Sequence, residues 1–116
     1  MEPPTVRSQV NSDRLSQLRE LLREDPEDRF LRYAIALELK RAGDMDAAAA
    51  DLEDLLRADP KYIACYYQLA LILAELGRTD DAVHTCEAGS LQCITTGDSK
   101  ARSELLALKE ALTGEE

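Results

Sequence analysis

The chain has 116 residues, 45% of them apolar, 4% aromatic and 32% charged, which is enough for one modest globular domain but not for two. A formal net charge of −9 argues against a surface that binds nucleic-acid phosphates or an anionic membrane, so we expect neither partner. No apolar run reaches the roughly 20 residues of a bilayer-spanning helix, and residues 1–5 lack the basic and apolar stretches of a secretory signal. We therefore expect a soluble, cytoplasmic protein.

The composition favours helices. Sixteen Ala and nineteen Leu stand against seven Val plus Ile, with no Trp and one Phe. Apolar residues recur at helical spacing in every long segment, as at Leu15, Leu18 and Leu22, and nothing alternates with period two. The sequence therefore predicts an all-α fold.

Capping and turn residues divide the chain into predicted helices. Residues 1–10, with two prolines and no apolar period, are predicted to be a disordered leader. A first helix is expected from Asn11 or Ser12 to about Glu24. Asp25 is expected to cap a second helix, with Pro26 in its first turn, that ends at Gly43.

The same signals continue to the end of the chain. A third helix is predicted over residues 44–58, and a fourth is expected to start at Asp59-Pro60 and to end at Gly77. The fifth begins near Thr79 and is expected to fade between Gly89 and Gly97. The last covers residues 99–112, before a frayed tail at 114–116.

A repeat of 34 residues organises the chain. Residues 25–58 aligned with 59–92 give ten identities, where composition alone would give about three. Each unit is two helices joined by a glycine turn, which is typical of stacked helical hairpins. Small residues are expected to let the two helices of each hairpin approach closely; they are Ala36, Ala48, Ala70 and Ala82.

These residues resemble the tetratricopeptide repeat (TPR) family. The 34-residue period, the small residues named above, the turns Gly43-Asp44 and Gly77-Arg78, and the closing Asp-Pro pairs match the family pattern twice. The resemblance implies one domain over residues 11–113, a right-handed superhelix of antiparallel hairpins with about six helices. Its parts are a half repeat (12–24), two repeats (29–62 and 63–96) and a closing helix (99–112). Short bacterial proteins that contain little else have a similar layout.

The chain departs from the family pattern at three places. Arg32 and Tyr66 stand where the family often has Trp. No proline follows the second repeat, so the junction before the last helix is predicted to be longer or bent. Gly89 occupies the position equivalent to Leu55, and we expect it to allow closer packing of the last helix despite a cost of about 1 kcal/mol in helix propensity.

No motif indicates catalysis. The chain has no phosphate-binding loop, nucleophile elbow or pair of histidines, so we expect no enzyme, cofactor or metal site. His84 and Cys86 would point about 200° apart on a helix and could not share one metal ion. Cys65, Cys86 and Cys93 are predicted to be buried structural thiols; a thiol-dependent enzyme or redox sensor is the alternative.

The resemblance implies a protein-interaction module. The first helix of each unit would line an inner surface that binds extended peptides or partner helices. We expect Tyr33 and Tyr67 to lie side by side there, either as ligand anchors or only as packing between helices. The predicted lining residues are Phe30, Tyr33, Leu37, Lys40, Arg41, Ala64, Tyr67, Gln68, Leu71, Glu75, Arg102 and Leu105.

The expected ligand is a peptide or segment of another protein. One TPR subgroup grips the C-terminal carboxylate of heat-shock chaperones with Lys and Asn; the corresponding places here are Tyr33, Leu37 and Gln68, so that clamp is not carried over. When the net charge is summed for each predicted helix, the negative charge lies mainly on the second helix of each hairpin. The predicted groove is therefore nearly neutral and partly aromatic. This predicts a hydrophobic or amphipathic ligand.

Self-association is the alternative function. Leucines 15, 18 and 22 of the first helix would be incompletely covered and could stack on a second copy. We therefore expect a monomer or a weak homodimer.

Overall fold

The protein is a row of helices. The computed structural model describes the backbone of residues 6–114 and the side chains of residues 13–114. Six helices and no strand occur in this part of the chain, which confirms the all-α prediction. They are α1 (Val6–Glu24), α2 (Arg29–Arg41), α3 (Met45–Ala58), α4 (Ala64–Glu75), α5 (Thr79–Thr96) and α6 (Ser99–Thr113).

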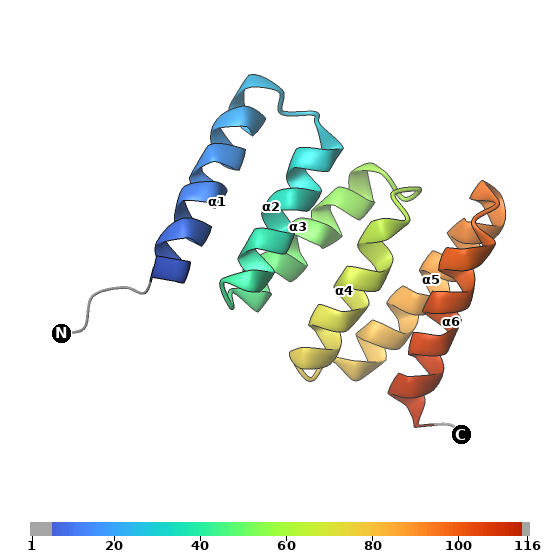
Figure 1. Ribbon diagram of the computed structural model, residues 1–116. Helices are drawn as coiled ribbons and strands as arrows, with labels where there is room; N and C mark the ends of the chain where they lie inside the picture. The colour runs from blue at the N-terminus through green and yellow to red at the C-terminus, as the bar shows by residue number, and fades with distance from the viewer. Residues whose placement is uncertain (1–5, 115–116) are drawn as a thin grey trace.

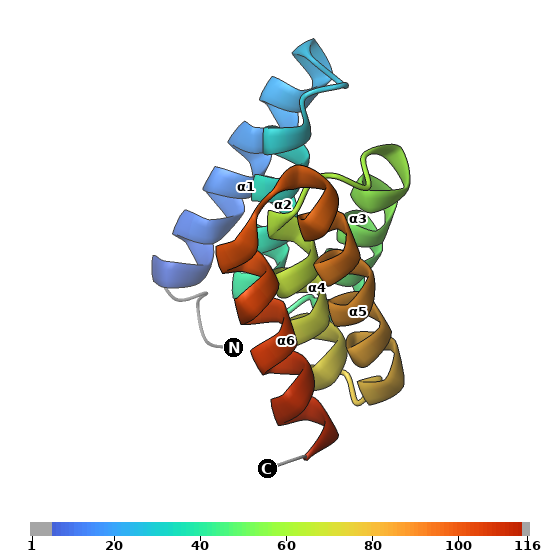
Figure 2. The same cartoon turned by 90° about the vertical axis from the view of Figure 1, so that its right-hand side faces the viewer.

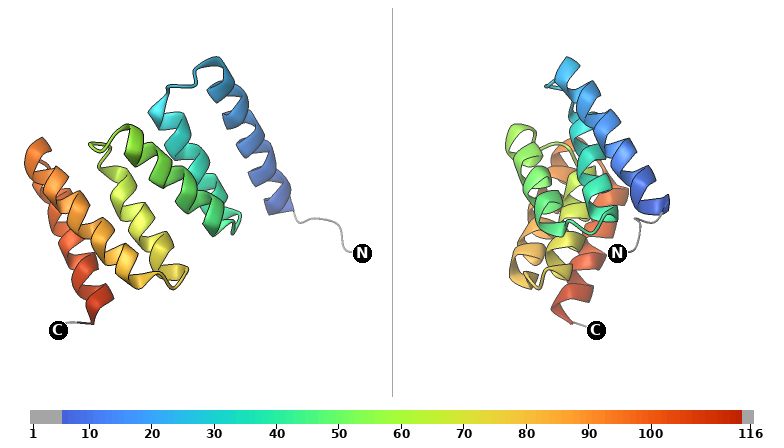
Figure 3. Two further views of the ribbon diagram at one scale, coloured as in Figure 1. Left: turned by 180° about the vertical axis from the view of Figure 1, so that it is seen from behind. Right: turned by 90° about the vertical axis from the view of Figure 1, so that its left-hand side faces the viewer.

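The helices form a TPR-like superhelix. Each packs against the next in the chain, and α6 also contacts α4 (Figure 1). Helices α2, α4 and α6 lie in front of α3 and α5 in Figure 1, and the view from behind in Figure 3 shows the reverse. Figure 2, which looks along the row from its C-terminal end, shows α6 packed over the hairpin of α4 and α5. No helix in the described part of the chain combines the length and the apolar character needed to cross a bilayer.

Glycines end α2 and α4, as predicted, and a glycine also ends α5. The φ angles of Gly43, Gly77 and Gly97 are 86°, 79° and 76°. These values lie in the left-handed region, which glycine adopts at lower energetic cost than residues with a Cβ atom. In each case the next residue donates its N–H to the carbonyl five residues earlier, over 2.8 to 2.9 Å, and so satisfies a free carbonyl of the last turn.

The starts of α2 and α4 correct the sequence prediction. Asp28, not Asp25, caps α2, and its carboxylate accepts a hydrogen bond from the Leu31 N–H over 3.0 Å. The Asp25 N–H donates to carbonyls at the end of α1, so Asp25 closes that helix. Asp59 closes α3 in the same way, and α4 begins only at Ala64. The two Asp-Pro pairs therefore lie in the turns between hairpins.

Two further boundaries differ from the prediction. Helix α1 begins at Val6, so residues 6–10 of the predicted leader are helical; residues 1–5 lie outside the described part. Helix α5 continues through Gly89 to Thr96, and only Gly97 and Asp98 separate it from α6. The Asp98 carboxylate accepts the Ala101 N–H over 3.1 Å. A glycine turn followed directly by this cap makes the junction short, where the missing proline had suggested a longer one.

The core is built around the small residues of the repeat. Ala36, Ala48, Ala70 and Ala82 are all completely buried, as the close approach of paired helices requires. Large apolar side chains fill the space around them; the most buried are Leu52, Leu55, Ile72 and Leu105.

The second repeat contains a close contact between helices at Gly89. A Cβ atom there would come within 2.7 Å of Tyr66 Cβ and Cγ and within 2.8 Å of Leu105 Cδ1. The Tyr66 ring is buried, and its hydroxyl donates to the Pro60 carbonyl over 2.6 Å. Gly89 therefore lets α5 pack closely against α4 and α6. At the equivalent positions of the first repeat, Leu55 is buried and Arg32 is half-buried.

Candidate functional site

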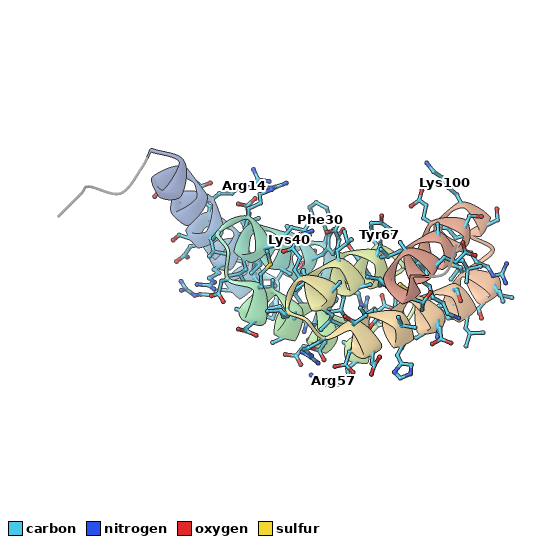
Figure 4. The ribbon with its side chains drawn as sticks, turned by 90° about the horizontal axis from the view of Figure 1, so that it is seen from below. Arg14, Phe30, Lys40, Arg57, Tyr67 and Lys100 are labelled. Atoms are coloured by element: carbon cyan, nitrogen blue, oxygen red, sulfur yellow. The ribbon has the colours of Figure 1, made fainter. Side chains whose placement is uncertain are left out.

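The predicted lining residues of α2 and α4 lie on one side of the row. We call this surface the α2/α4 face; it comprises Phe30, Tyr33, Leu37, Lys40 and Arg41 of α2 and Tyr67, Gln68, Leu71 and Glu75 of α4. Figure 4 shows Phe30, Lys40 and Tyr67 on the same side of the molecule, with Arg57 of α3 on the opposite side. Arg14 of α1 and Lys100 of α6 lie at the two edges of that side, so the outer helices flank the face.

One end of the face is aromatic. Phe30, in the first turn of α2, is 66% exposed. Tyr67 of α4 is half-buried, but it directly precedes Gln68, the hydrogen-bond partner of Lys40, and so lies toward the other end of the face. Tyr33 stacks against Tyr62, with ring centroids 5.5 Å apart and planes tilted by 43°. The ring neighbour of Tyr33 is therefore Tyr62, in the turn before α4, and not Tyr67 as predicted.

This tyrosine pair has a packing role. Burial raises the pKa of both Tyr33 and Tyr62 above the usual value of 10.0. Tyr33 thus holds α2 against the segment that leads into α4, while Phe30 and Tyr67 leave aromatic surface uncovered.

The other end of the face is polar. Lys40 Nζ donates to Gln68 Oε1 over 3.0 Å and so links α2 to α4. Arg41 forms an ion pair with Oε1 of Glu38, one helical turn earlier. Arg14 Nε reaches the same oxygen from α1 over 2.8 Å.

Glu38 is the residue that the sequence analysis missed. Its side chain is only 2% exposed, and Oε2 is buried without a hydrogen-bond partner. Its position between the buried residues Ile35 and Leu39 was the available signal, because all three fall on one stripe of the helix. Glu38 joins α1 to α2 beside the α2/α4 face.

The remaining predicted residues divide by exposure. Leu37 and Leu71 are half-buried on the face, and Glu75 and Arg102 are exposed. Leu105 is only 1% exposed, so its predicted place on the surface is wrong. Leu105 belongs to an apolar stripe of α6, with Ala101 and Leu108, and this stripe packs against the core.

The three thiols are buried, as predicted. Burial raises the pKa of the Cys65 thiol from 9.0 to about 12, and it also raises the pKa values of Cys86 and Cys93. The thiolate is the reactive form, so these groups are poor nucleophiles near neutral pH. His84 is exposed whereas Cys86 is buried, and the described residues contain no group of three or more side chains suited to a metal ion.

Comparisons with known proteins match this geometry. A family model described as tetratricopeptide repeat matches residues 39–92. A solution structure of a tetratricopeptide repeat domain protein from Salinibacter ruber is 39% identical, with a TM-score of 0.75, and the match covers 79% of this chain and 93% of that chain. The chain belongs to the tetratricopeptide repeat family. A crystal structure of a TPR domain protein from the same organism is 38% identical, with a TM-score of 0.72, and covers 78% of this chain and 100% of that one.

A more distant TPR structure shares the fold. The TPR2B domain of yeast Sti1, solved as a complex with pHsp70, is 17% identical and has a TM-score of 0.82. The match covers 93% of this chain and 86% of that chain. The comparison with curated proteins finds no match.

Proposed function

We propose that this TPR chain is a protein-interaction module whose α2/α4 face binds a peptide or a segment of another protein. The exposure of Phe30 carries the proposal, because 66% of a large apolar side chain faces water on the same side as Tyr67. Aromatic side chains in such positions act as anchors at protein interfaces. The family supports this function, and the Sti1 domain of the same fold was solved in a complex.

We propose a binding role rather than a catalytic one. The α2/α4 face brings together aromatic, aliphatic and cationic side chains, and Glu38, the carboxylate beside its cations, is buried and paired. The thiols, which would be the nucleophiles of the enzymatic alternative, lie in the core with raised pKa values.

A comparison of two double variants tests the proposal. Peptides are selected from a displayed random library on the wild-type protein and then titrated against Phe30→Ala with Tyr67→Ala. The matched control is Leu91→Ala with Ile94→Ala, which removes two α5 side chains that are 65% and 60% exposed.

We expect the Phe30 and Tyr67 variant to bind the selected peptides at least tenfold more weakly, because anchor residues contribute most of the affinity at an interface. The control should bind as the wild type does. Equal affinity of all three proteins for every selected peptide would place the binding surface elsewhere. Unfolding midpoints of the variants show whether the fold is kept.

Self-association is a second candidate function. Leu21 of α1 is about half exposed, whereas Leu15, Leu18 and Leu22 pack partly against the core. Sedimentation velocity over a hundredfold range of concentration tests this function. A constant monomeric sedimentation coefficient would exclude it in that range, and a dimer that Leu21→Glu disrupts would support it.

A further inference from the structure

Three cationic side chains lie at or beside the C-terminal end of α2. They are Arg14, Lys40 and Arg41, and Figure 4 shows Arg14 and Lys40 on the side of the α2/α4 face. One buried carboxylate, Glu38, accepts from both arginines through a single oxygen. Lys40 donates to the Gln68 amide, which is neutral. The cluster therefore carries excess positive charge in a chain whose net charge is −9.

The cations of this cluster keep donors free for a ligand. The side chains of Arg14 and Arg41 are 59% and 58% exposed. A guanidinium has five N–H donors and an ammonium has three, so the bonds to Glu38 and Gln68 use only some of the available hydrogen-bond donors. Glu75 is the exposed anion of the same face. It lies seven residues beyond Gln68 on α4, which is about 10 Å along the helix axis.

The aromatic and cationic ends of the face lie a fixed distance apart. Phe30 and Lys40 are ten residues apart on α2, which corresponds to about 15 Å along the helix. An extended peptide advances about 3.3 Å per residue, so four or five of its residues cover this distance.

We propose that the segment bound by the α2/α4 face is acidic at one end, with Asp or Glu side chains on Arg14, Lys40 and Arg41, and apolar at the other. The apolar side chain rests on Phe30, four or five residues from the acids. This inference rests on the proposed function and adds the charge and the spacing of the ligand. Side-chain carboxylates inside a chain are sufficient, and a free C-terminus is not required.

Synthetic peptides test the charge and the spacing. The probes are fluorescent 12-residue peptides, acetylated and amidated, with one Leu and two adjacent Glu in a Gly-Ser background. Spacings of two to eight residues are made in both orders, and matched sets carry Gln or Lys in place of Glu. We expect the Glu set at spacings of four or five to bind at least tenfold more tightly than the Lys set, and to weaken as salt is raised because counterions screen exposed charges.

The outcomes separate this inference from the proposed function. Gln or Lys peptides that bind as well as the Glu peptides would overturn the acidic preference and leave the binding face in place. If no set binds while peptides selected from the displayed library still do, the inference fails and the proposed function stands. If a free C-terminal carboxylate on the Gln peptides restores full affinity, the face recognises a chain terminus and the inference is wrong.

Two single variants test whether the preference for acidic peptides comes from Lys40. Lys40→Gln should weaken binding of the best Glu peptide by about two- to fivefold, as expected for one exposed ion pair, and should leave the Gln peptide unaffected. Arg57→Gln is the matched control, since it removes one exposed positive charge on the opposite side of the molecule (Figure 4). Equal losses in the two variants would indicate an effect of net charge alone and would overturn the local contact.

Discussion

Replacement of Gly89 by alanine should destabilise the protein although alanine is the better helix former. In an open helix the change would add about 1 kcal/mol of stability. Here the new Cβ would lie 2.7 Å from Tyr66 Cβ and Cγ and 2.8 Å from Leu105 Cδ1. Leu105 Cδ1 ends a flexible side chain, but Tyr66 Cβ is fixed to the backbone of α4, and the ring is held by its bond to the Pro60 carbonyl.

The clash can be relieved only if α4 and α5 separate. Overpacking costs about 1–3 kcal/mol, and contacts under 3 Å place this change in the upper part of that range, at about 2–3 kcal/mol. Less the propensity gain of about 1 kcal/mol, we expect a net loss of about 1–2 kcal/mol. For a chain of this size that corresponds to a fall in Tm of roughly 3–10 °C.

Thermal and urea unfolding followed by circular dichroism measure the loss. Ala88→Gly, at the exposed neighbour on the same helix, is the control and should cost about 1 kcal/mol through propensity alone. A Gly89→Ala variant more stable than the wild type would refute the close contact between α4 and α5.

The buried carboxylate and the buried thiols give two more predictions. The double variant Arg14→Ala with Arg41→Ala leaves Glu38 buried without a cation, so its free energy of unfolding in urea should fall by about 3–5 kcal/mol. Glu38→Gln should lower it less, because both arginines can then be hydrated. A Glu38→Gln variant that loses as much stability as the double variant would contradict the buried-charge explanation. Burial raises the pKa of the Cys65 thiol from 9.0 to about 12, so as pH rises the thiol loses its proton in the unfolded chain before it does in the folded protein. The free energy of unfolding should therefore fall between pH 9.0 and 12, by at most about 1.4 kcal/mol per pH unit. The fall should be shallower in Cys65→Ala, and an unchanged slope would show that this thiol does not contribute.

The sequence predicted the features that repeat. Gly43 and Gly77, with the buried alanines 34 residues apart, determine where each hairpin turns and how closely its helices pack, so period and spacing were enough to predict them. Helix starts were harder, since Asp25 and Asp28 are both good capping residues three positions apart. Only the geometry of the reversal between α1 and α2 selects Asp28, because Asp25 is already used to end α1.

Side-chain partners on the candidate face were predicted less well. Helical spacing placed Tyr33 and Tyr67 at equivalent positions, but the partner of Tyr33 is Tyr62, which lies in a turn with no period. The Glu38 bridge depends on Arg14 of α1, and no spacing within one repeat relates those two residues. Sequence periodicity gives the position of a residue on its own helix, whereas pairs between elements depend on how the helices are docked.

The unequal residue pairs of the two repeats bear on the fidelity of folding. A chain of identical repeats can dock one hairpin in the place of another, or exchange hairpins with a second molecule. In this chain Leu105 of α6 packs against Gly89 of the second hairpin, whereas the equivalent position of the first repeat holds Leu55. If α6 docked on the first hairpin, Leu105 would meet a leucine side chain where glycine leaves room. The difference between Gly89 and Leu55 therefore favours docking of α6 on the second hairpin while the array assembles.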